Sequence, residues 1–365
     1  MGDPAIAAVA AEIHARYGAD GFVVAPAGCC LFGGRDRERE AEGFIDHYRR
    51  FRTRCTALSE EPPPVDGVAT TWNNLRFKSY LYLPWLYHLI FDNDLLKAAA
   101  RALLGTDDVV VWSTDWCVKP PAPLEARASP AAGAYFSWHQ DSTYSGFGAD
   151  GVTVWLAFSE VDADSGPVVL KRGSHRLGQF PHFETGPGDG NMLAFGQTVP
   201  RAGADRGATS AGSSEVSEAE ATAAARLTLE QRAWASLPEE SAILSPGQFS
   251  AHSFLTVHSS QPNRSAIGVG PFAGDRVGLA IRLVRADSSV GAADRKGLGT
   301  RRLPYRVTML CGDERAAEAG NPAGSFELER HRPAEEFGER EMAEWRRSML
   351  REEEIYFGDS GVQWR

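Results

Sequence analysis

The sequence predicts a mainly β fold with flanking helices, in which short strands form an antiparallel sandwich or barrel. From Val109 onward, short apolar runs alternate with segments rich in Gly, Pro and Ser. Residues 1–105 instead place their apolar side chains at helical spacing. With 365 residues, 43% of them hydrophobic, the chain can bury a sizeable core. We expect a single domain over residues 1–365.

The predicted helices lie at the two ends of the chain. Apolar residues recur every three or four positions between charged ones, and Gly105 follows the third segment as a stop signal. The last segment is expected to pack on the outside of the sheet. The segments predicted to be helical are 4–17, 37–55, 81–104 and 330–357.

The predicted strands form a core over residues 109–310, and a short apolar strand at 21–24 precedes them. Residues 203–226 interrupt the core with Ala, Ser, Gly and Glu, so we expect a surface insertion there, helical in its second half. The β-type runs are 109–119, 134–141, 152–161, 166–174, 242–260 and 276–284.

Composition excludes several classes of partner. Lys and Arg number 38 against 48 Asp and Glu, which gives a net charge of −10 with no basic stripe, so a nucleic-acid surface is not expected. The five cysteines form an odd set without a Cys-x-x-Cys pair. This favours reduced thiols in the cytoplasm over zinc held by sulfur. No apolar run reaches the roughly 18 residues of a membrane span, and the N-terminus does not resemble a secretory signal.

The stretch YFSWHQDSTYSGF, residues 135–147, contains a His-x-Asp pattern. Because side chains alternate along a strand, His139 and Asp141 are expected on one face with Gln140 on the other. This predicts two metal ligands that converge on one point. A hydrogen-bonded His–Asp pair at the end of a strand is the alternative.

A metal site needs a third ligand, and FSAHSFLTVHSSQPN offers His252 and His258. The two have the same strand parity, so periodicity does not choose between them. The polar turn after His258 favours that residue. Two histidines and one carboxylate leave adjacent positions of a metal open, which is the arrangement of non-haem Fe(II) sites that activate dioxygen.

Such an oxygenase, if it uses 2-oxoglutarate, needs a cation for the distal carboxylate of this co-substrate. In DRVGLAIRL, alternation places Arg276, Gly278, Ala280 and Arg282 on one face. The small residues beside Arg276 predict room for a bound molecule. Alternatively, Arg276 begins an edge strand and pairs with a surface acid.

Five segments, in this order, resemble the phytanoyl-CoA dioxygenase-like family of iron and 2-oxoglutarate oxygenases: WHQDSTYSGF, VTVWLAFSEVDADSGPVVLKRGSH, NMLAFGQTV, LSPGQFSAHSFLTVHSSQPNRS and DRVGLAIRL. The resemblance covers roughly residues 110–330 and is nearest the branch of 2-aminoethylphosphonate-type dioxygenases. It implies a double-stranded β-helix, a cupin-like jelly-roll barrel with helices outside.

By position, the resemblance implies roles for individual residues. His139, Asp141 and His258 resemble the iron ligands. Arg276 resembles the arginine that binds 2-oxoglutarate, with Arg264 as a rival because the turn NRSAIGVGPFAGD is long. Further contacts to 2-oxoglutarate are implied for Lys119, Trp155 and Ser260.

The implied reaction hydroxylates an aliphatic C–H of a small polar substrate, while 2-oxoglutarate and O2 become succinate and CO2. Asp141 favours hydroxylation, because halogenating relatives replace this carboxylate with a small residue. Ser142 and Ser145 stand where the branch is expected to have leucine and tryptophan, which predicts a more open or polar pocket.

The substrate stays open between a phosphonate-type compound, an amino-acid derivative and an acyl-CoA. Two other classes of function also remain: a non-catalytic β-barrel binding protein, and a cupin-like metal protein, such as an isomerase or hydrolase, that does not use 2-oxoglutarate.

Overall fold

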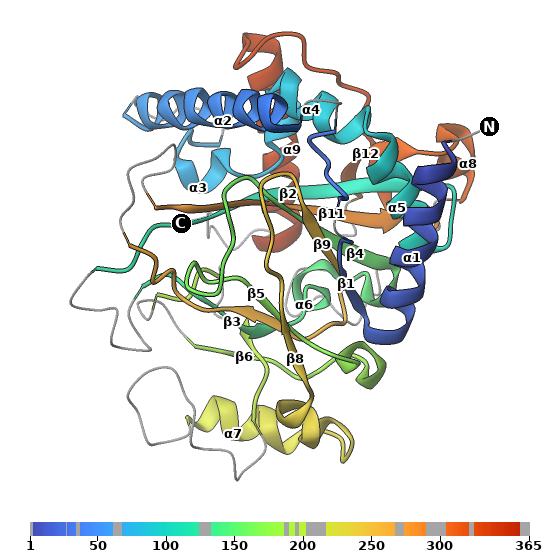
Figure 1. Ribbon diagram of the computed structural model, residues 1–365, viewed down its shortest axis with the longest axis vertical. Helices are drawn as coiled ribbons and strands as arrows, with labels where there is room; N and C mark the ends of the chain where they lie inside the picture. Colours follow the sequence, from blue (N-terminus) through green and yellow to red (C-terminus); the bar gives the residue numbers. More distant parts are fainter. Residues whose placement is uncertain are drawn as a thin grey trace.

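Two sheets, antiparallel except for one parallel pair at an end of the larger sheet, form the centre of the protein, which we describe from a computed structural model (Figure 1). The larger sheet has the order β1 (Phe22–Val24), β9 (Phe249–Ser253), β4 (Gly151–Ala157), β11 (Arg276–Arg285), β2 (Val109–Lys119), β12 (Tyr305–Cys311) and β13 (Phe326–Leu328). The smaller sheet has the order β3 (Phe136–His139), β10 (His258–Ser260), β5 (Val168–Lys171) and β8 (Glu239–Ser241). A third pair joins β6 (Phe183–Glu184) to β7 (Gln197–Thr198). The structure describes residues 3–26, 28–33, 37–60, 68–123, 133–185, 190–193, 197–201, 217–266, 274–289, 304–320 and 325–357.

The predicted alternation along β11 is confirmed. Val277, Leu279 and Ile281 are fully buried in the main apolar core, which the helices share. Arg276 and Arg282 point to the opposite side, into a cavity between the sheets. One side of the large sheet therefore serves stability and the other carries polar side chains.

Helices of the N-terminal part cover the outer side of the large sheet, and the smaller sheet lies on its other side (Figure 1). The predicted mainly β fold with flanking helices is confirmed. The helices here are α1 (Pro4–Asp20), α2 (Arg37–Ser59), α3 (Trp72–Leu75), α4 (Pro84–Phe91) and α5 (Asp94–Leu104), with the 3-10 turn η1 (Ser79–Leu81) between α3 and α4. Further short helices along the chain are α6 (Ser142–Ser145), η3 (Gly148–Asp150), η4 (Ser174–Leu177), η5 (Gln231–Ser236) and α8 (Glu314–Gly320).

The helical segment predicted over 81–104 is helical but contains two α-helices, α4 and α5, where the prediction drew no break. The chain breaks between α4 and α5, where the Asn93 side chain accepts a hydrogen bond from the Leu96 amide at 3.0 Å. Asn93 is thus an N-cap, and it starts a new helix where the apolar periodicity alone suggested a continuous one.

The C-terminal helix α9 (Glu339–Phe357) begins later than predicted and is more than an outer cover. Trp345 is fully buried and its indole Nε1 donates to the Phe77 carbonyl at 3.0 Å. Lys78 and Glu352 form a buried ion pair at 2.8 Å. Met349 and Glu352 line the cavity, so α9 closes part of its wall.

The predicted insertion at 203–226 is described only in part. Residues 203–216 lie outside the described residues, and α7 (Glu218–Ala225) forms the expected helix in the second half. The five cysteines form no disulfide with one another. Among the helices that the structure describes, none is long and apolar enough to cross a bilayer.

Candidate metal centre

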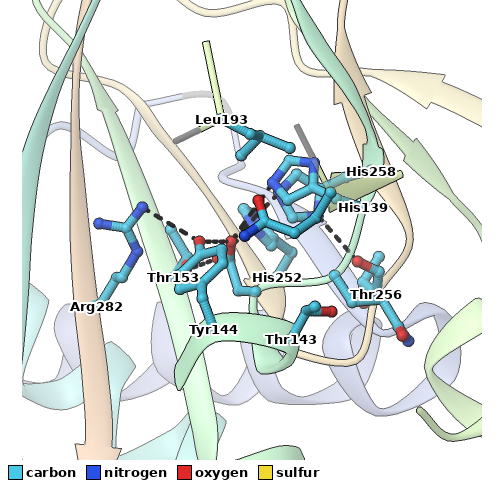
Figure 2. A network of polar contacts seen from close by, with 12 residues as sticks. His139, Thr143, Tyr144, Thr153, Leu193, His252, Thr256, His258 and Arg282 are labelled. Carbon is cyan, nitrogen blue, oxygen red and sulfur yellow. Dashed lines mark hydrogen bonds and ion pairs between the residues drawn. The ribbon is translucent and has the colours of Figure 1, made fainter. Parts of the chain in front are cut away.

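His139, Asp141 and His258 come together at one point of the cavity. Figure 2 shows the two imidazoles, His139 and His258, side by side there. Each offers one ligand atom, and these atoms all lie within 4.8 Å of one another. The Nε2 atoms of His139 and His258 are each 3.7 Å from Asp141 Oδ1. Since ligand bonds of about 2 Å suit a metal held by imidazole and carboxylate, one ion can reach all three atoms. The three residues are buried, as a site with few waters requires.

Strand pairing and backbone hydrogen bonds orient the two imidazoles. His139 ends β3 and lies directly across from His258 in β10. His139 Nδ1 donates to the Ser137 carbonyl at 2.7 Å, and His258 Nδ1 donates to the Thr256 carbonyl at 2.9 Å. Because each Nδ1 carries the proton, each Nε2 presents a lone pair to the centre, which is the tautomer a metal needs.

Asp141 reaches the centre through a turn, so the strand argument for it was wrong. β3 ends at His139, and Asp141 has right-handed helical angles, φ −63° and ψ −26°, at the start of α6. Gln140 does point away as expected, since its amide donates to the carbonyls of Gly178 and Leu255.

Two hydroxyl groups, those of Tyr144 and Thr153 (labelled in Figure 2), hold the Asp141 carboxylate. Tyr144 donates to Oδ1 and Thr153 donates to Oδ2. Arg282 in turn donates to the Tyr144 hydroxyl at 3.3 Å. Such outer partners fix the orientation of a metal-binding carboxylate.

The electrostatics of the centre favour an ionised Asp141 carboxylate beside a neutral His258 imidazole. Burial acts to raise the pKa of Asp141, but the adjacent His139, His252 and His258 and the charge of Arg282 outweigh it and lower the pKa well below its usual range. Burial, and then the neighbouring imidazoles, lower the pKa of His258 well below its ordinary value. Both shifts prepare the groups to bind a cation.

His252 is a fourth imidazole at the centre. It lies in β9, opposite Thr153 of β4, and its Nε2 is 3.5 Å from Asp141 Oδ2. Its ring is 4.2 Å from that of His258, and neither ring nitrogen makes a hydrogen bond within the described part of the chain. The residues between β9 and β10 carry the chain from one sheet to the other, so the two histidines face each other from different sheets.

A second polar group lies where β11 pairs with β2. Arg276 is directly opposite Lys119, and the two side chains are 1% and 0% exposed. Lys119 Nζ donates to the Ser260 carbonyl, to Ser260 Oγ and to the Gln261 carbonyl at 2.6–2.7 Å. Arg276 Nη2 donates to Ser260 Oγ at 3.3 Å, and its guanidinium lies 5.0 Å from the ring of Trp155.

Of the four residues that the sequence assigned to 2-oxoglutarate, Arg276, Trp155 and Ser260 line the cavity, whereas Lys119 lies behind it. All three acceptors of Lys119 Nζ are uncharged, so no negative group compensates the charge of its ammonium group. Burial lowers the pKa of Arg276 to about 10, and burial together with Arg276 lowers the pKa of Lys119 well below its usual value. No carboxylate of the described residues pairs with either cation, which leaves a buried positive site suited to an anion.

The three candidate arginines lie in different surroundings. Arg276 is not an edge-strand residue paired with a surface acid, because β11 lies between β4 and β2 in the sheet and the Arg276 side chain is buried. Arg264 is exposed and does not line the cavity. Arg282 lines the cavity on the side of Asp141.

The expectation of room beside Arg276 is met at Ala280, which lines the cavity, but not at Gly278, and the expectation for Ser142 and Ser145 was wrong. A Cβ at Gly278 would lie 1.9 Å from Trp155 Cζ2, so the indole of Trp155 occupies the room beside Arg276. Ser142 and Ser145 are buried but do not line the cavity, and Ser142 donates to Gln179. They face away because α6 turns after Asp141.

The cavity encloses about 130 Å³ and contains both polar groups. Several of its residues were missed from the sequence: Arg76, Asp115, Tyr144 and Thr153. Alternation could have found two of them, since Asp115 has the parity of Lys119 and Thr153 has that of Trp155. Arg76 gave no such signal, because it lies outside any long strand.

Residues 79–268 match the family model described as phytanoyl-CoA dioxygenase (PhyH). The chain belongs to the PhyH family. The matched residues include all three members of the candidate metal centre, and Arg276 lies just beyond them. No curated protein sequence matches the chain.

Solved structures resemble this PhyH protein over most of its length. The apo non-heme monooxygenase ThoJ aligns with a TM-score of 0.61 at 19% identity and covers 96% of this chain and 100% of its own. The ThoJ–Ni complex aligns with a TM-score of 0.56 at 19% identity, covering 94% and 98%. EvdO2 from Micromonospora carbonacea var. aurantiaca complexed with 2-oxoglutarate aligns with a TM-score of 0.47 at 17% identity, covering 77% and 92%. The likeness to ThoJ establishes the fold.

Proposed function

We propose that the protein is an Fe(II)- and 2-oxoglutarate-dependent dioxygenase that hydroxylates an aliphatic C–H of a small polar substrate. One observation carries the proposal: a buried His–Asp–His centre shares one cavity with the buried Arg276, behind which Lys119 is also buried, and neither cation has an acidic partner among the described residues. A ligand with a chelating end and a distal carboxylate connects the two groups, and 2-oxoglutarate has this form.

His139 Nε2, His258 Nε2 and Asp141 Oδ1 would hold the iron, because they combine two neutral imidazoles with one ionised carboxylate. When bound, iron and 2-oxoglutarate supply the activation of dioxygen, with succinate and CO2 as co-products. Tyr144 and Thr153 keep the carboxylate in its ligating orientation through their hydrogen bonds. The retained Asp141 supports hydroxylation over halogenation.

Arg276 would bind the distal carboxylate of 2-oxoglutarate. Its Nε has no hydrogen-bond partner in the described part of the chain, and its Nη2 has only a long bond to Ser260. Lys119 fixes Ser260 from behind and adds positive charge, while Trp155 covers one face of the guanidinium. A metal protein that did not use 2-oxoglutarate would gain nothing from burying these two cations, since an unpaired buried charge is costly.

Formation of succinate from 2-oxoglutarate tests the proposal. Purified protein is loaded with Fe(II) without oxygen, then exposed to O2 and 2-oxoglutarate with a panel of phosphonates, amino acids, quaternary amines and acyl-CoAs. We expect succinate in the presence of iron, with a substrate-dependent increase for a phosphonate or amino-acid derivative. Asp141→Ala should lose both iron and succinate formation. Folded, iron-loaded protein that forms no succinate with any of these compounds would refute the proposal.

A further inference from the structure

A second cationic group lines the cavity on the Asp141 side, away from Arg276. It consists of Arg76, Asp115 and Arg282, whose side chains are 14%, 6% and 12% exposed. Arg76 Nη1 is 3.3 Å from Asp115 Oδ1, and Arg282 Nη2 is 3.9 Å from Asp115 Oδ2. Two guanidinium groups therefore share one carboxylate.

The sheet holds this group rigidly. Asp115 lies in the middle of β2, paired on one side with Ala280 of β11. On the other side Phe77 forms a bridge to Asp115, and the Arg76 carbonyl accepts from the Trp116 amide at 3.2 Å. Arg76 thus has a fixed backbone although it follows the short helix α3, and Arg282 belongs to the longest pairing of the fold. Fixed positions are what a binding site needs.

The hydrogen-bonding capacity of the group is largely unused. Arg76 Nε, Arg282 Nε and Asp115 Oδ1 are buried without a hydrogen-bond partner in the described part of the chain. The two ion contacts are also longer than the roughly 2.7–2.9 Å of a direct charged hydrogen bond. Buried polar groups normally find partners, so unpaired donors on residues that line a cavity point to a missing ligand. Because this part of the lining has two guanidinium groups and only one carboxylate between them, it favours an anion.

We propose that Arg76 and Arg282 bind the anionic group of the primary substrate, a carboxylate or a phosphonate, an inference that rests on the proposed oxygenase function. The charges distinguish the two anion sites. Arg276 and Lys119 have no carboxylate partner among the described residues and so bind the co-substrate. Arg76 and Arg282 share Asp115, and the other carboxylate that acts on Arg282 is Asp141, which a bound metal would neutralise, so one further anionic group is favoured here.

The position of Arg282 also limits the size of the substrate. Its Nη2 donates to the Tyr144 hydroxyl, and this hydroxyl donates to Asp141, so the guanidinium is one side chain away from the metal centre. Phe77, Trp112 and Met349 supply apolar walls on this side. The geometry therefore selects a short aliphatic molecule that is oxidised within a few bonds of its anionic group.

Binding is measured without turnover to test this assignment. The protein is loaded with redox-inert Zn(II) and saturated with 2-oxoglutarate. Butanoate, propylphosphonate and the neutral butanamide are then titrated by ligand-observed NMR. We expect the two anions to bind and butanamide to bind at least tenfold more weakly. Arg76→Gln and Arg282→Gln should each weaken anion binding by roughly thirtyfold or more, because each removes one partner of a desolvated charge pair.

Matched variants separate recognition from folding. Arg285→Gln removes a charge from the same strand at a residue that pairs with Asp287 at the surface, and it should bind the anions like the parent protein. Arg76→Lys keeps the charge but loses the planar fork, and it should bind the anions with intermediate affinity. In every variant the affinity for 2-oxoglutarate should stay within about twofold.

Three results would overturn the assignment: equal binding of butanamide and butanoate, unchanged anion binding in both glutamine variants, or a selective loss of 2-oxoglutarate binding in those variants. Because the readout needs no succinate, it is independent of the test of the oxygenase function. Anion binding that depends on Arg76 in a protein without succinate formation would support the anion site and reject the oxygenase.

Discussion

Replacement of Arg276 by alanine tests the proposed site of 2-oxoglutarate most directly. The guanidinium is 1% exposed, and burial already lowers its pKa to about 10, so its charge is poorly solvated before any ligand binds. Removal of one partner of such a desolvated pair costs about 2–5 kcal/mol. Lys119 still supplies positive charge behind the site, so we expect the lower part of this range, about 2–3 kcal/mol. The affinity for 2-oxoglutarate should then fall roughly thirtyfold to 150-fold.

The measurement is the dissociation constant of 2-oxoglutarate for the Fe(II)-loaded protein without oxygen, followed by optical titration. Iron affinity should not change, because Arg276 contacts none of the three candidate ligands. Arg276→Lys should lose less affinity, since it keeps the charge but not the bidentate fork. Arg264→Ala is the matched control, because Arg264 is exposed and lies outside the cavity.

The assignment of Arg276 would be refuted if Arg276→Ala kept its affinity for 2-oxoglutarate within about twofold while Arg264→Ala or Arg282→Ala lost affinity for 2-oxoglutarate. Arg282 is the more serious rival because it lines the same cavity. It is already engaged with Tyr144 and Asp115, however, whereas Arg276 forms no ion pair among the described residues and lies opposite the cation Lys119. A bound 2-oxoglutarate dianion is therefore stabilised more by Arg276 than by Arg282.

Three further predictions concern metal, packing and thiols. His258→Ala should lose iron, whereas His252→Ala should retain it with weaker substrate binding, as measured by metal analysis and titration; the reverse would exchange their roles. Gly278→Ala should destabilise the fold by about 1–3 kcal/mol in urea unfolding, because the new methyl group overlaps Trp155, and an unchanged midpoint would contradict this packing. Cys55 should resist iodoacetamide at pH 8 until the protein is unfolded, because burial raises the pKa of its thiol to about 12; rapid labelling of folded protein would show that it is accessible.

The sequence predicted those site residues whose placement follows from local rules. Alternation along one strand correctly turned Arg276 toward the cavity and Leu279 toward the core. The same rule failed at Asp141, because the strand ends at His139 and a turn completes the approach. It also failed for the space at Gly278, since a cavity beside a small residue depends on the neighbour across the sheet.

Other residues could not be predicted because their proximity is set by the topology of the sheets. His252 and His258 have the same parity in the sequence, yet they approach each other from opposite sheets. Arg76 reaches Asp115 only because the chain after α3 runs beside β2. No periodicity in a single sequence records which distant segment will lie next to a strand.

The charges around the cavity suggest how one pocket distinguishes two anionic molecules. At the β2–β11 end, Arg276 and Lys119 are both positive and lack an acidic partner among the described residues, so this end favours the molecule that brings the most uncompensated charge. At the other end Asp115 lies between Arg76 and Arg282, so an anion bound there gains less electrostatic stabilisation. The fit of its apolar part against the cavity wall then contributes more to its affinity. An Asp115→Asn variant would make the two ends more alike. We expect it to bind 2-oxoglutarate as an inhibitor in the substrate position, seen as inhibition at high 2-oxoglutarate that the parent protein lacks. Absence of such inhibition in a folded, active variant would show that Asp115 orients the arginines without separating the two anions.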